Sequence, residues 1–398
     1  MTQNFELDQM HCFVCQSDEF EQIGLNQNLL DASDFREATA KNIGFTYVLT
    51  TCQKCGHSAI QTDNPCVLPT RKYNFVTYGE PTEHYPKIAT ILKSLELSSG
   101  DISIHCFSTK DFQLANFLAN ELKISDVNLN DHAGCSDDWL PEISISGSKP
   151  DPLPLTRFQL EIESSEKSHQ IILITRIFDH VANYDLLQKI LELSSATRHI
   201  VFDLNNYERL FELDTLEFIW NERRNLLRRS HLESILSRWS LQYSIFAYES
   251  QEVSPTLTGV ISERLDKSIN SVSLDVIKWQ APHLIEKLIS LRQRWQDKLA
   301  TTHKLGIIGA SHKGISLAQF VLNDHTQYSL HDDKEALKGK TPPANPPLGF
   351  HSVSGFDFNN YSHIAITTTL VIAKKIIPKL RASGYTGEIL DFDCRKLD

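Results

Sequence analysis

The chain has 398 residues, with 39 basic and 50 acidic side chains, and its net charge of −11 argues against non-specific nucleic-acid binding by the whole surface. It has no apolar run of about 18 residues, and its first ten residues, MTQNFELDQM, are polar and acidic, so we expect neither a membrane span nor a signal peptide. The hydrophobic content of 41% is that of an ordinary globular protein with room for two or three domains.

Two Cys-x-x-Cys pairs lie near the start of the chain, Cys12 with Cys15 and Cys52 with Cys55. Two such knuckles typically present four thiolates to zinc, and a complete shell of sulfurs predicts a structural site. The 36 residues between the pairs require an inserted loop or hairpin. Four buried free cysteines are the alternative. Cysteine usage of this kind favours a reducing cytoplasm, and we predict a zinc-binding module over residues 1–70.

A first α/β unit follows the cysteine pairs. Periodicity predicts a helix from Tyr85 that ends at Gly100, a strand over 102–107, a helix over 112–123 and a strand over 125–131. The turn between the first strand and its helix reads Phe-Ser-Thr-Lys-Asp and contains no glycine. Such a turn is usually glycine-rich where a cofactor approaches the backbone closely.

The alternation of strands and helices continues along the chain. Residues 133–157 are predicted as a loop, 169–178 as a buried parallel strand, 184–195 as a helix and 199–204 as a strand. This order predicts a doubly wound sheet. Residues 213–245 are predicted to be helical, and a long helix is predicted over 276–300.

A second α/β unit starts at Lys304 with a strand, a glycine turn and a helix. A buried strand over 363–370, a helix closed by Gly384 and a last strand over 388–392 complete it. The fold class is therefore α/β. We predict a Rossmann-like domain with a helical insertion over residues 71–300 and a second Rossmann-like domain over 301–398.

Several stretches together resemble one family. They are TCQKCGHSAIQ, YNFVTYGEPTEHY (73–85), TRIFDHVAN (175–183), EFIWNERRNLL (217–227), IIGASHKGISL (307–317) and EALKGKTPP (335–343). With the order of the modules, they resemble the S-adenosylmethionine-dependent sugar C-methyltransferases, which alkylate keto-deoxysugars carried on a nucleoside diphosphate. In such chemistry a base removes a proton beside a ketone and nearby donors stabilise the enolate.

The resemblance implies a role for each matching position. Cofactor binding falls on Tyr78, Phe107, Ser108 and Asp131. Catalysis falls on His180, Glu222 and Arg223. Binding of the anionic substrate falls on Gly309, Ser311, His312 and Lys313.

Two of these positions depart from the family pattern. Side chains throughout the turn at 107–111 would crowd the methionine part of the cofactor. Only Glu222 of the family's Tyr-His-Glu-His is kept, and Arg223 stands where the base histidine is expected, although a guanidinium does not deprotonate near neutral pH. His180 remains as a base or donor. Its alternative is a histidine satisfied by backbone groups at a helix start, and the alternative for Asp131 is a strand-end aspartate.

Glycine is scarce in this chain but clusters at Gly306, Gly309 and Gly314, beside Lys313. A glycine turn that opens a helix with a lysine is a good anion site, and tight packing of strand on helix is the alternative. Arginines also cluster over 223–238. They form either a solvated face paired with glutamates or a site that recognises a diphosphate or carboxylate.

Three functions follow from these observations. The first is a methyltransferase on a nucleotide-linked sugar or a similar anion. The second is a diverged relative that keeps the anion site without methyl transfer, for other chemistry or as a non-catalytic partner. The third, a zinc-dependent nucleic-acid binder, is disfavoured by the acidic charge. The first two require a shared groove between His180 and Lys313.

Overall fold

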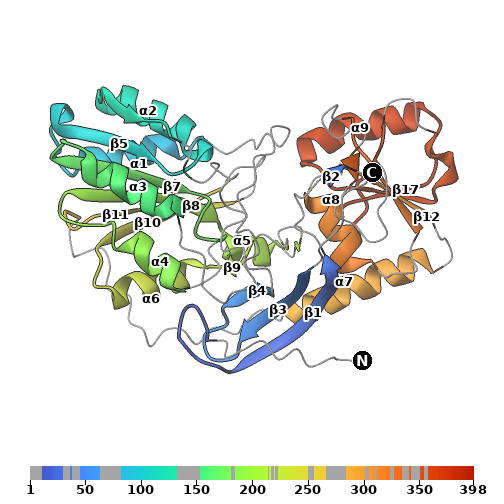
Figure 1. Ribbon diagram of the computed structural model, residues 1–398. Coiled ribbons are helices and arrows are strands. Elements are labelled where there is room, and N and C mark those ends of the chain that lie inside the picture. The colour runs from blue at the N-terminus through green and yellow to red at the C-terminus, as the bar shows by residue number, and fades with distance from the viewer. Residues whose placement is uncertain are drawn as a thin grey trace.

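The computed structural model describes a large part of the chain, and all structural statements below concern that part. Its residues are 11–29, 36–37, 45–62, 82–130, 132, 153–180, 184–213, 215–216, 219, 223–249, 255–265, 284–300, 304–309, 312–322, 327–333, 340–341, 350–353 and 357–398. The protein is α/β, with two Rossmann-like sheets in separate lobes and an antiparallel N-terminal sheet below them (Figure 1). The predicted fold class is confirmed.

The N-terminal sheet carries the cysteine knuckles. Its strands are β1 (Phe20–Leu29), β3 (Phe45–Cys52), β4 (Ser58–Thr62) and β9 (Asn225–Leu226), in the order β1-β3-β4-β9. All neighbours are antiparallel. The long insertion between the knuckles also contains β2 (Arg36–Glu37), which pairs with β14 (Lys340–Thr341) from the C-terminal part of the chain.

The first Rossmann-like sheet has six strands in the order β10-β11-β8-β7-β5-β6. Their bounds are β5 (Ile102–Cys106), β6 (Asp126–Asn128), β7 (His169–Thr175), β8 (Arg198–Asn205), β10 (Tyr243–Tyr248) and β11 (Thr256–Ile261). Strand β5 is parallel to β6 and β7, whereas β11 is antiparallel to both of its neighbours. The chain reverses direction across the sheet between β5 and β7, and ligands of such sheets bind at the carboxyl ends of the strands there.

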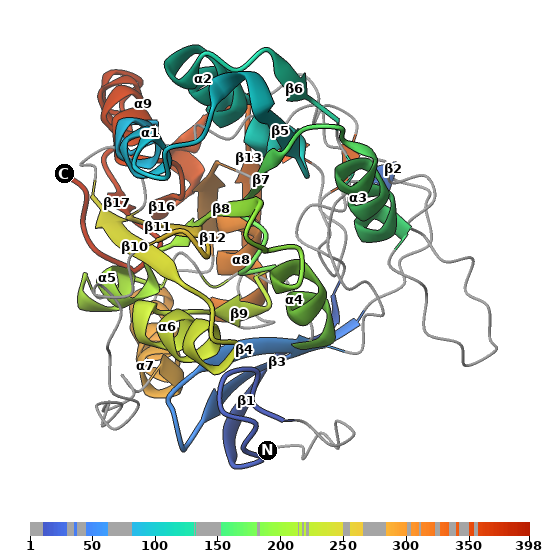
Figure 2. The ribbon, with the colours of Figure 1, turned by 90° about the vertical axis from the view of Figure 1, so that its left-hand side faces the viewer.

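Helices cover both faces of this sheet (Figure 2). Their bounds are α1 (Tyr85–Lys93), α2 (Phe112–Leu122), α3 (Leu153–Ser164), α4 (Tyr184–Leu191), α5 (Tyr207–Glu212) and α6 (Arg229–Arg238). Ile171 and Leu173 of β7 pack in one core with α1 and α2, while Ile172 and Ile174 pack in another with α3, α4 and α6. The strand is therefore buried on both sides, as its continuous apolar sequence predicts.

The second Rossmann-like sheet is parallel throughout, in the order β15-β13-β12-β16-β17. Its strands are β12 (Lys304–Ile308), β13 (Gln327–His331), β15 (Phe350–His351), β16 (His363–Ile366) and β17 (Glu388–Leu390). Helix α8 (His312–Ser316) continues as a π-helical turn over Leu317–Val321. Helix α9 (Leu370–Ala382) is capped by Ser383 and followed by Gly384, whose φ is +90°. The glycine turn follows β12 beside β16, where this sheet reverses.

Contacts near the C-terminus join the two lobes at their base. The carboxylate of Asp393 accepts hydrogen bonds from the hydroxyl of Thr215 at 2.6 Å and the amide of Leu216 at 2.8 Å. The indole of Trp295, on α7 (Leu284–Leu299), donates to the carbonyl of Phe392 at 3.0 Å. Above these contacts the lobes diverge (Figure 1).

The structure corrects several sequence expectations. Helix α1 ends at Lys93, and Gly100 lies in a 3-10 turn over Ser99–Asp101. Residues 213–245 are not one helix, because β9, α6 and the start of β10 occupy them. The predicted loop over 133–157 overlaps the start of α3. The predicted domain boundaries remain a prediction.

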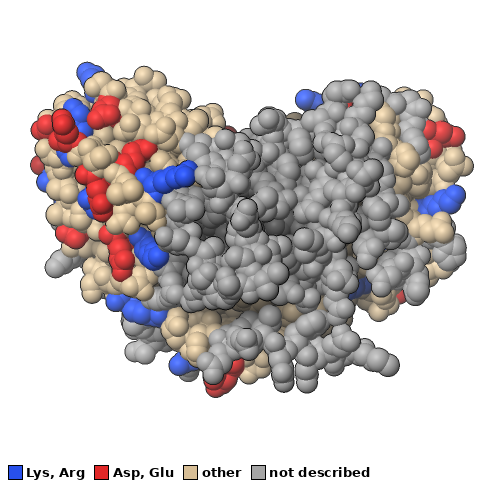
Figure 3. Space-filling view, viewed as in Figure 1, with Lys and Arg blue, Asp and Glu red and all other residues tan. Residues whose placement is uncertain are grey.

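The described residues contain no helix that is both long and apolar enough to span a membrane. On the face shown in Figure 3, acidic and basic side chains are interspersed over the first lobe. The groove predicted between His180 and Lys313 remains a prediction.

Candidate functional site

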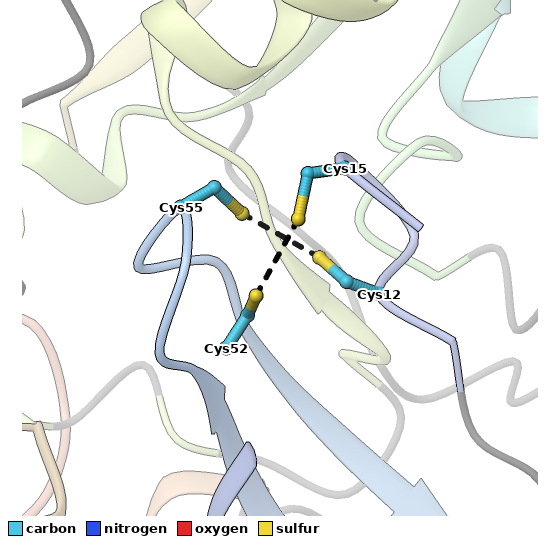
Figure 4. A group of neighbouring side chains, drawn as sticks. All are labelled: Cys12, Cys15, Cys52 and Cys55. Carbon is cyan, nitrogen blue, oxygen red and sulfur yellow. Dashed lines mark hydrogen bonds between the residues drawn. The ribbon is translucent and has the colours of Figure 1, made fainter. Parts of the chain in front are cut away.

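The four cysteines of the two knuckles converge on one point (Figure 4). Their sulfurs all lie within 4.8 Å of one another, with Cys12 to Cys55 and Cys15 to Cys52 at 3.5 Å each. Tetrahedral zinc with Zn–S bonds of about 2.3 Å places its sulfurs ~3.8 Å apart. The donor set therefore fits a structural zinc ion with a complete shell.

The two knuckles share a backbone design. The residue after each Cys-x-x-Cys has a left-handed conformation, with a φ of +60° at Gln16 and +69° at Gly56. The amide of each residue donates to the carbonyl of the first cysteine of its pair, Cys12 at 2.9 Å and Cys52 at 2.8 Å. These tight turns aim both thiols of a pair in one direction, and a glycine suits the second turn because it adopts this φ freely.

His57 lies beside the cluster, with Nδ1 3.8 Å from the sulfur of Cys12. Burial, together with the charge of Arg228, lowers the pKa of His57 to about 3, so its ring is neutral near pH 7. Since four thiolates already complete the shell, His57 suits a supporting role around the ligands rather than ligation.

Buried groups on and before α6 hold the second knuckle. Arg228 donates to the carbonyl of Gly56 at 2.6 Å, and Nε2 of His231 lies 3.1 Å from the carbonyl of Cys55. Arg238 donates to the carbonyl of Val14 in the first knuckle. Two of the clustered arginines therefore dock the zinc module. Sequence reasoning missed this role because charge spacing alone does not reveal a carbonyl partner far along the chain.

The glycine-free turn after β5 is closed by its own last side chain. Asp111 is fully buried, and one of its carboxylate oxygens accepts from the amides of Phe107 at 2.9 Å and Ser108 at 2.8 Å. The other oxygen accepts from the amide and the hydroxyl of Thr175 at the end of β7. Burial raises the pKa of Asp111 to about 7, although these donors act in the opposite direction.

Phe107 adds a hydrophobic seal to the same turn. Its side chain is 1% exposed and lies edge-on to Phe158 of α3, with ring centroids 5.2 Å apart. The two predicted cofactor residues Phe107 and Ser108 thus face the protein interior. Tyr78 and Asp131, the other two predicted for the cofactor, lie outside the described residues.

Polar side chains that follow β6 are hydrogen-bonded to α3. Glu161 of α3 lies 2.9 Å from His105, 2.8 Å from His132 and 2.6 Å from Asn130. Burial alone would raise the pKa of Glu161, but these three partners outweigh it and lower the pKa to about 2. The residues after β6, where a ribose acid is expected, are therefore tied to α3.

The residues of the turn after β5, 107–111, do not fit the S-adenosylmethionine that the resemblance implies. The amides of the turn, which could receive a ligand, already donate to Asp111. A close backbone approach also needs small residues, and here Phe107 fills the adjoining space.

A second polar cluster lies where β7 and β8 end. Asp179 is 1% exposed, and its Oδ2 accepts from Asn205 and from the hydroxyl of Tyr207, both at 2.9 Å. His180 Nε2 lies 3.8 Å from Oδ1 of this carboxylate, and Arg223 Nε lies 4.0 Å from Oδ2. The structure thus brings two of the predicted catalytic residues, His180 and Arg223, to one aspartate; Glu222 lies outside the described residues.

Two carboxylates in this cluster are held ionised. Burial alone would raise the pKa of Asp179, but the charges of His180, Arg223 and Arg176 outweigh it and lower the pKa to about 2. At Asp203 burial is likewise outweighed by Arg176 and His84, and its pKa is lowered. Arg176 has a φ of +56°, a strained conformation of the kind that occurs at functional sites.

The glycine turn of the second lobe is a tight packing contact. Gly309 has a φ of +94°, and a Cβ there would lie 2.5 Å from the Cγ2 of Thr368. A Cβ on Gly314 would lie 2.5 Å from the carbonyl oxygen of Gly309. Packing alone thus requires both glycines. The side chain of His312 and all of Ser311 lie outside the described part, so anion binding with Lys313 remains a prediction.

A surface hollow of about 200 Å³ lies between α3 and α4. Thr156, Lys189 and Arg198 are among its lining residues. Arg198 begins β8, so the hollow lies at the amino end of that strand, opposite the edge where ligands of such sheets bind.

Comparison with known proteins gives little. No family model matches the sequence, and no curated protein is similar to it. Among solved structures, the chain is similar to the crystal structure of the methyltransferase domain of bacterial CtHen1-CN. The identity is 14%, the match covers 45% of this chain and 97% of that chain, and the TM-score is 0.29. The assignment of fold therefore stands on strand order and register.

Proposed function

We propose that this chain is a diverged methyltransferase-like protein that binds an anionic metabolite of the nucleotide-linked sugar class without using S-adenosylmethionine. The carboxylate of Asp111 carries the proposal, because it occupies the amides of Phe107 and Ser108 at the point where the first sheet reverses. A structural zinc ion held by the four cysteines and a cytoplasmic location belong to the same proposal.

The order of the first sheet supports the methyltransferase-like part of this proposal. Dinucleotide-binding sheets of the Rossmann type are essentially parallel. Here β11 lies antiparallel between β8 and β10, so the sheet departs from that all-parallel type. The sheet therefore does not favour a dinucleotide cofactor, and the function is argued from the turn and not from the fold alone.

A second candidate is retained C-methyl transfer, and the pairing of His180 with Asp179 favours it. An ionised carboxylate beside an imidazole orients the ring and stabilises its protonated form, as needed for a group that takes a proton from a carbon beside a ketone. Arg223, facing the same aspartate, could supply positive charge near an enolate but not act as the base.

Isothermal titration separates the two candidates. We expect no heat with S-adenosylmethionine or its demethylated product up to about 1 mM, and binding of a nucleoside diphosphate such as UDP. Loss of UDP binding in Lys313→Ala would support the predicted site in the second lobe. Micromolar binding of the demethylated product would reverse the order of the candidates, and a His180→Ala variant would then test the proposed base.

A further inference from the structure

Arg224 is a buried cation whose guanidinium has no hydrogen-bonding partner among the described residues. Its side chain is 3% exposed, and within the described part of the chain none of its three guanidinium nitrogens forms a hydrogen bond. The guanidinium lies over the ring of Tyr47, with its carbon 5.5 Å from the ring centroid. No ion pair found among the described residues includes it.

The other arginines of the cluster differ from Arg224. Arg228, also buried, donates to the carbonyl of Gly56, and Arg238 donates to that of Val14. Arg229 is half exposed and pairs with Glu233 at 2.8 Å. Docking of the zinc module and surface pairing thus account for these three, and neither accounts for Arg224.

A buried guanidinium without partners is costly. Removing a charge from water is unfavourable by several kcal/mol unless an opposite charge and hydrogen bonds replace the hydration. Stacking on an aromatic ring returns only about 1–2 kcal/mol of this. The guanidinium has five N–H donors, and an oxyanion of a ligand would supply both the acceptors and the opposite charge.

The backbone places Arg224 where the zinc module meets the first lobe. Its carbonyl accepts from the amide of Ile60 in β4 at 3.0 Å, while the amide of the next residue, Asn225, donates to the carbonyl of Asp179 at 3.0 Å. The preceding residue, Arg223, faces the carboxylate of Asp179. Arg224 is thus fixed on a short paired segment, directly beside the Asp179–His180 cluster.

We propose that Arg224 is the receptor for an oxyanion of the ligand, specifically a phosphate group. The choice of phosphate rests on the function proposed above; the requirement for an anion rests on the guanidinium alone. The planar fork of arginine binds two oxygens of a phosphate or carboxylate at once, which matches the vacant donors. The sequence offered the whole arginine cluster over 223–238 as a candidate site for a diphosphate or carboxylate but did not single out Arg224.

The test uses the full-length zinc-loaded protein in phosphate-free buffer, with inorganic pyrophosphate as the probe and malonate as a carboxylate of similar size. Wild type, Arg224→Met and Arg229→Met are compared by thermal unfolding and by titration calorimetry. Arg229→Met is the matched control, because it removes an arginine that already has a partner on the protein surface.

Two opposite effects are expected. Without anion, Arg224→Met melts at or above the wild-type temperature, since an uncompensated buried charge is gone. With pyrophosphate, wild type and Arg229→Met gain at least about 2 °C, and Arg224→Met gains nothing and binds at least tenfold more weakly, the loss expected for a charged hydrogen bond. Arg224→Lys, which keeps the charge and loses the fork, falls between the two.

The outcomes separate this proposal from the function above. A pyrophosphate response lost in Arg224→Met supports the receptor even if UDP does not bind, and a response to malonate alone that is lost in the variant overturns phosphate as the ligand group. An Arg224→Met protein that melts lower than wild type and responds equally to pyrophosphate assigns Arg224 to stacking on Tyr47 and overturns the proposal. UDP binding unchanged in Arg224→Met also overturns it, while leaving the proposed function intact.

Discussion

Asp111 and Thr175 join the two strands between which the first sheet reverses direction. Thr175, the last residue of β7, donates both its backbone amide, at 2.8 Å, and its hydroxyl, at 2.5 Å, to Oδ1 of Asp111. The second oxygen of that carboxylate takes two amides of the turn after β5. The carboxylate of Asp111 therefore accepts hydrogen bonds from turn amides that lie where a ligand binds in other sheets of this class.

Replacing Asp111 with alanine should destabilise the protein. At pH 8, above the pKa of about 7, the carboxylate is ionised and accepts from three buried amides and a hydroxyl. Leaving those donors unsatisfied should cost about 3 kcal/mol of unfolding free energy, measured by urea denaturation. Asp101→Ala, at an exposed position, is the matched control and should change little. An Asp111→Ala protein as stable as wild type would show that the turn does not depend on this carboxylate.

Much of the fold was predictable because its signals are local. The apolar run of β7 and the alternation of strands and helices around it identify a doubly wound sheet without any tertiary information. The spacing of Leu155, Phe158 and Ile162, all buried in the structure, was also a readable helical signal for α3. The proline- and glycine-rich sequence before it concealed that signal.

The candidate site was predictable only where spacing determines geometry. The two Cys-x-x-Cys pairs are such a case, since each knuckle positions its thiols through a short turn. The partners of Asp111 and the docking role of Arg228 were not, because each bond joins residues brought together by the fold: Asp111 to Thr175, and Arg228 to Gly56. The segment around Arg224 was read as helical, whereas its short strand pairs with the zinc sheet.

Removal of one knuckle thiol should release the metal. We expect about one zinc per wild-type chain and a loss of most of it in Cys52→Ser, because three thiolates bind zinc far more weakly than four. The melting temperature should fall with the metal, and a strong chelator should have the same effect on wild type. The comparison is Cys394→Ser, a cysteine whose sulfur lies 3.9 Å from the carbonyl of Arg294 and which belongs to no such cluster among the described residues. Wild-type protein free of zinc but equally stable would contradict a structural metal site.

Arg228, which donates to the second knuckle, should affect the affinity of the site for zinc. Arg228→Ala removes the donor to the carbonyl of Gly56, which lies directly after Cys55 in the second knuckle. Supporting groups of this kind change metal affinity by about tenfold or more, so zinc transfer to a competing chelator should become correspondingly faster. The neighbouring variant Arg229→Ala, which loses only a surface pair with Glu233, should release zinc at the wild-type rate. Equal rates of zinc release in the two variants would mean that Arg228 does not support the metal site.

The buried aspartate beside His180 should make stability depend on acid pH. The pKa of Asp179 falls from 3.8 to about 2 in the folded protein, because the charges of His180, Arg223 and Arg176 outweigh the effect of burial. A carboxylate whose folded pKa is lowered contributes stability that is complete above its unfolded pKa and is lost as the pH falls through the folded value. The contribution of Asp179 should thus be whole above about pH 5 and disappear towards pH 2, and its size is about 2 kcal/mol.

The measurement is urea denaturation of wild type and Asp179→Asn between pH 6 and pH 2.5. The asparagine variant should be less stable at pH 6, because it lacks the charge that compensates Arg223 and Arg176. Its stability should also fall less steeply as the pH decreases, so the two curves should converge in acid. Wild type will still lose stability from Glu161, whose pKa is also lowered to about 2, so the difference between the curves, and not either slope, is diagnostic. Parallel curves would mean that Asp179 is no more acidic in the folded chain than in the unfolded one, and the cluster around His180 would then lack the fixed negative charge on which its proposed proton chemistry depends.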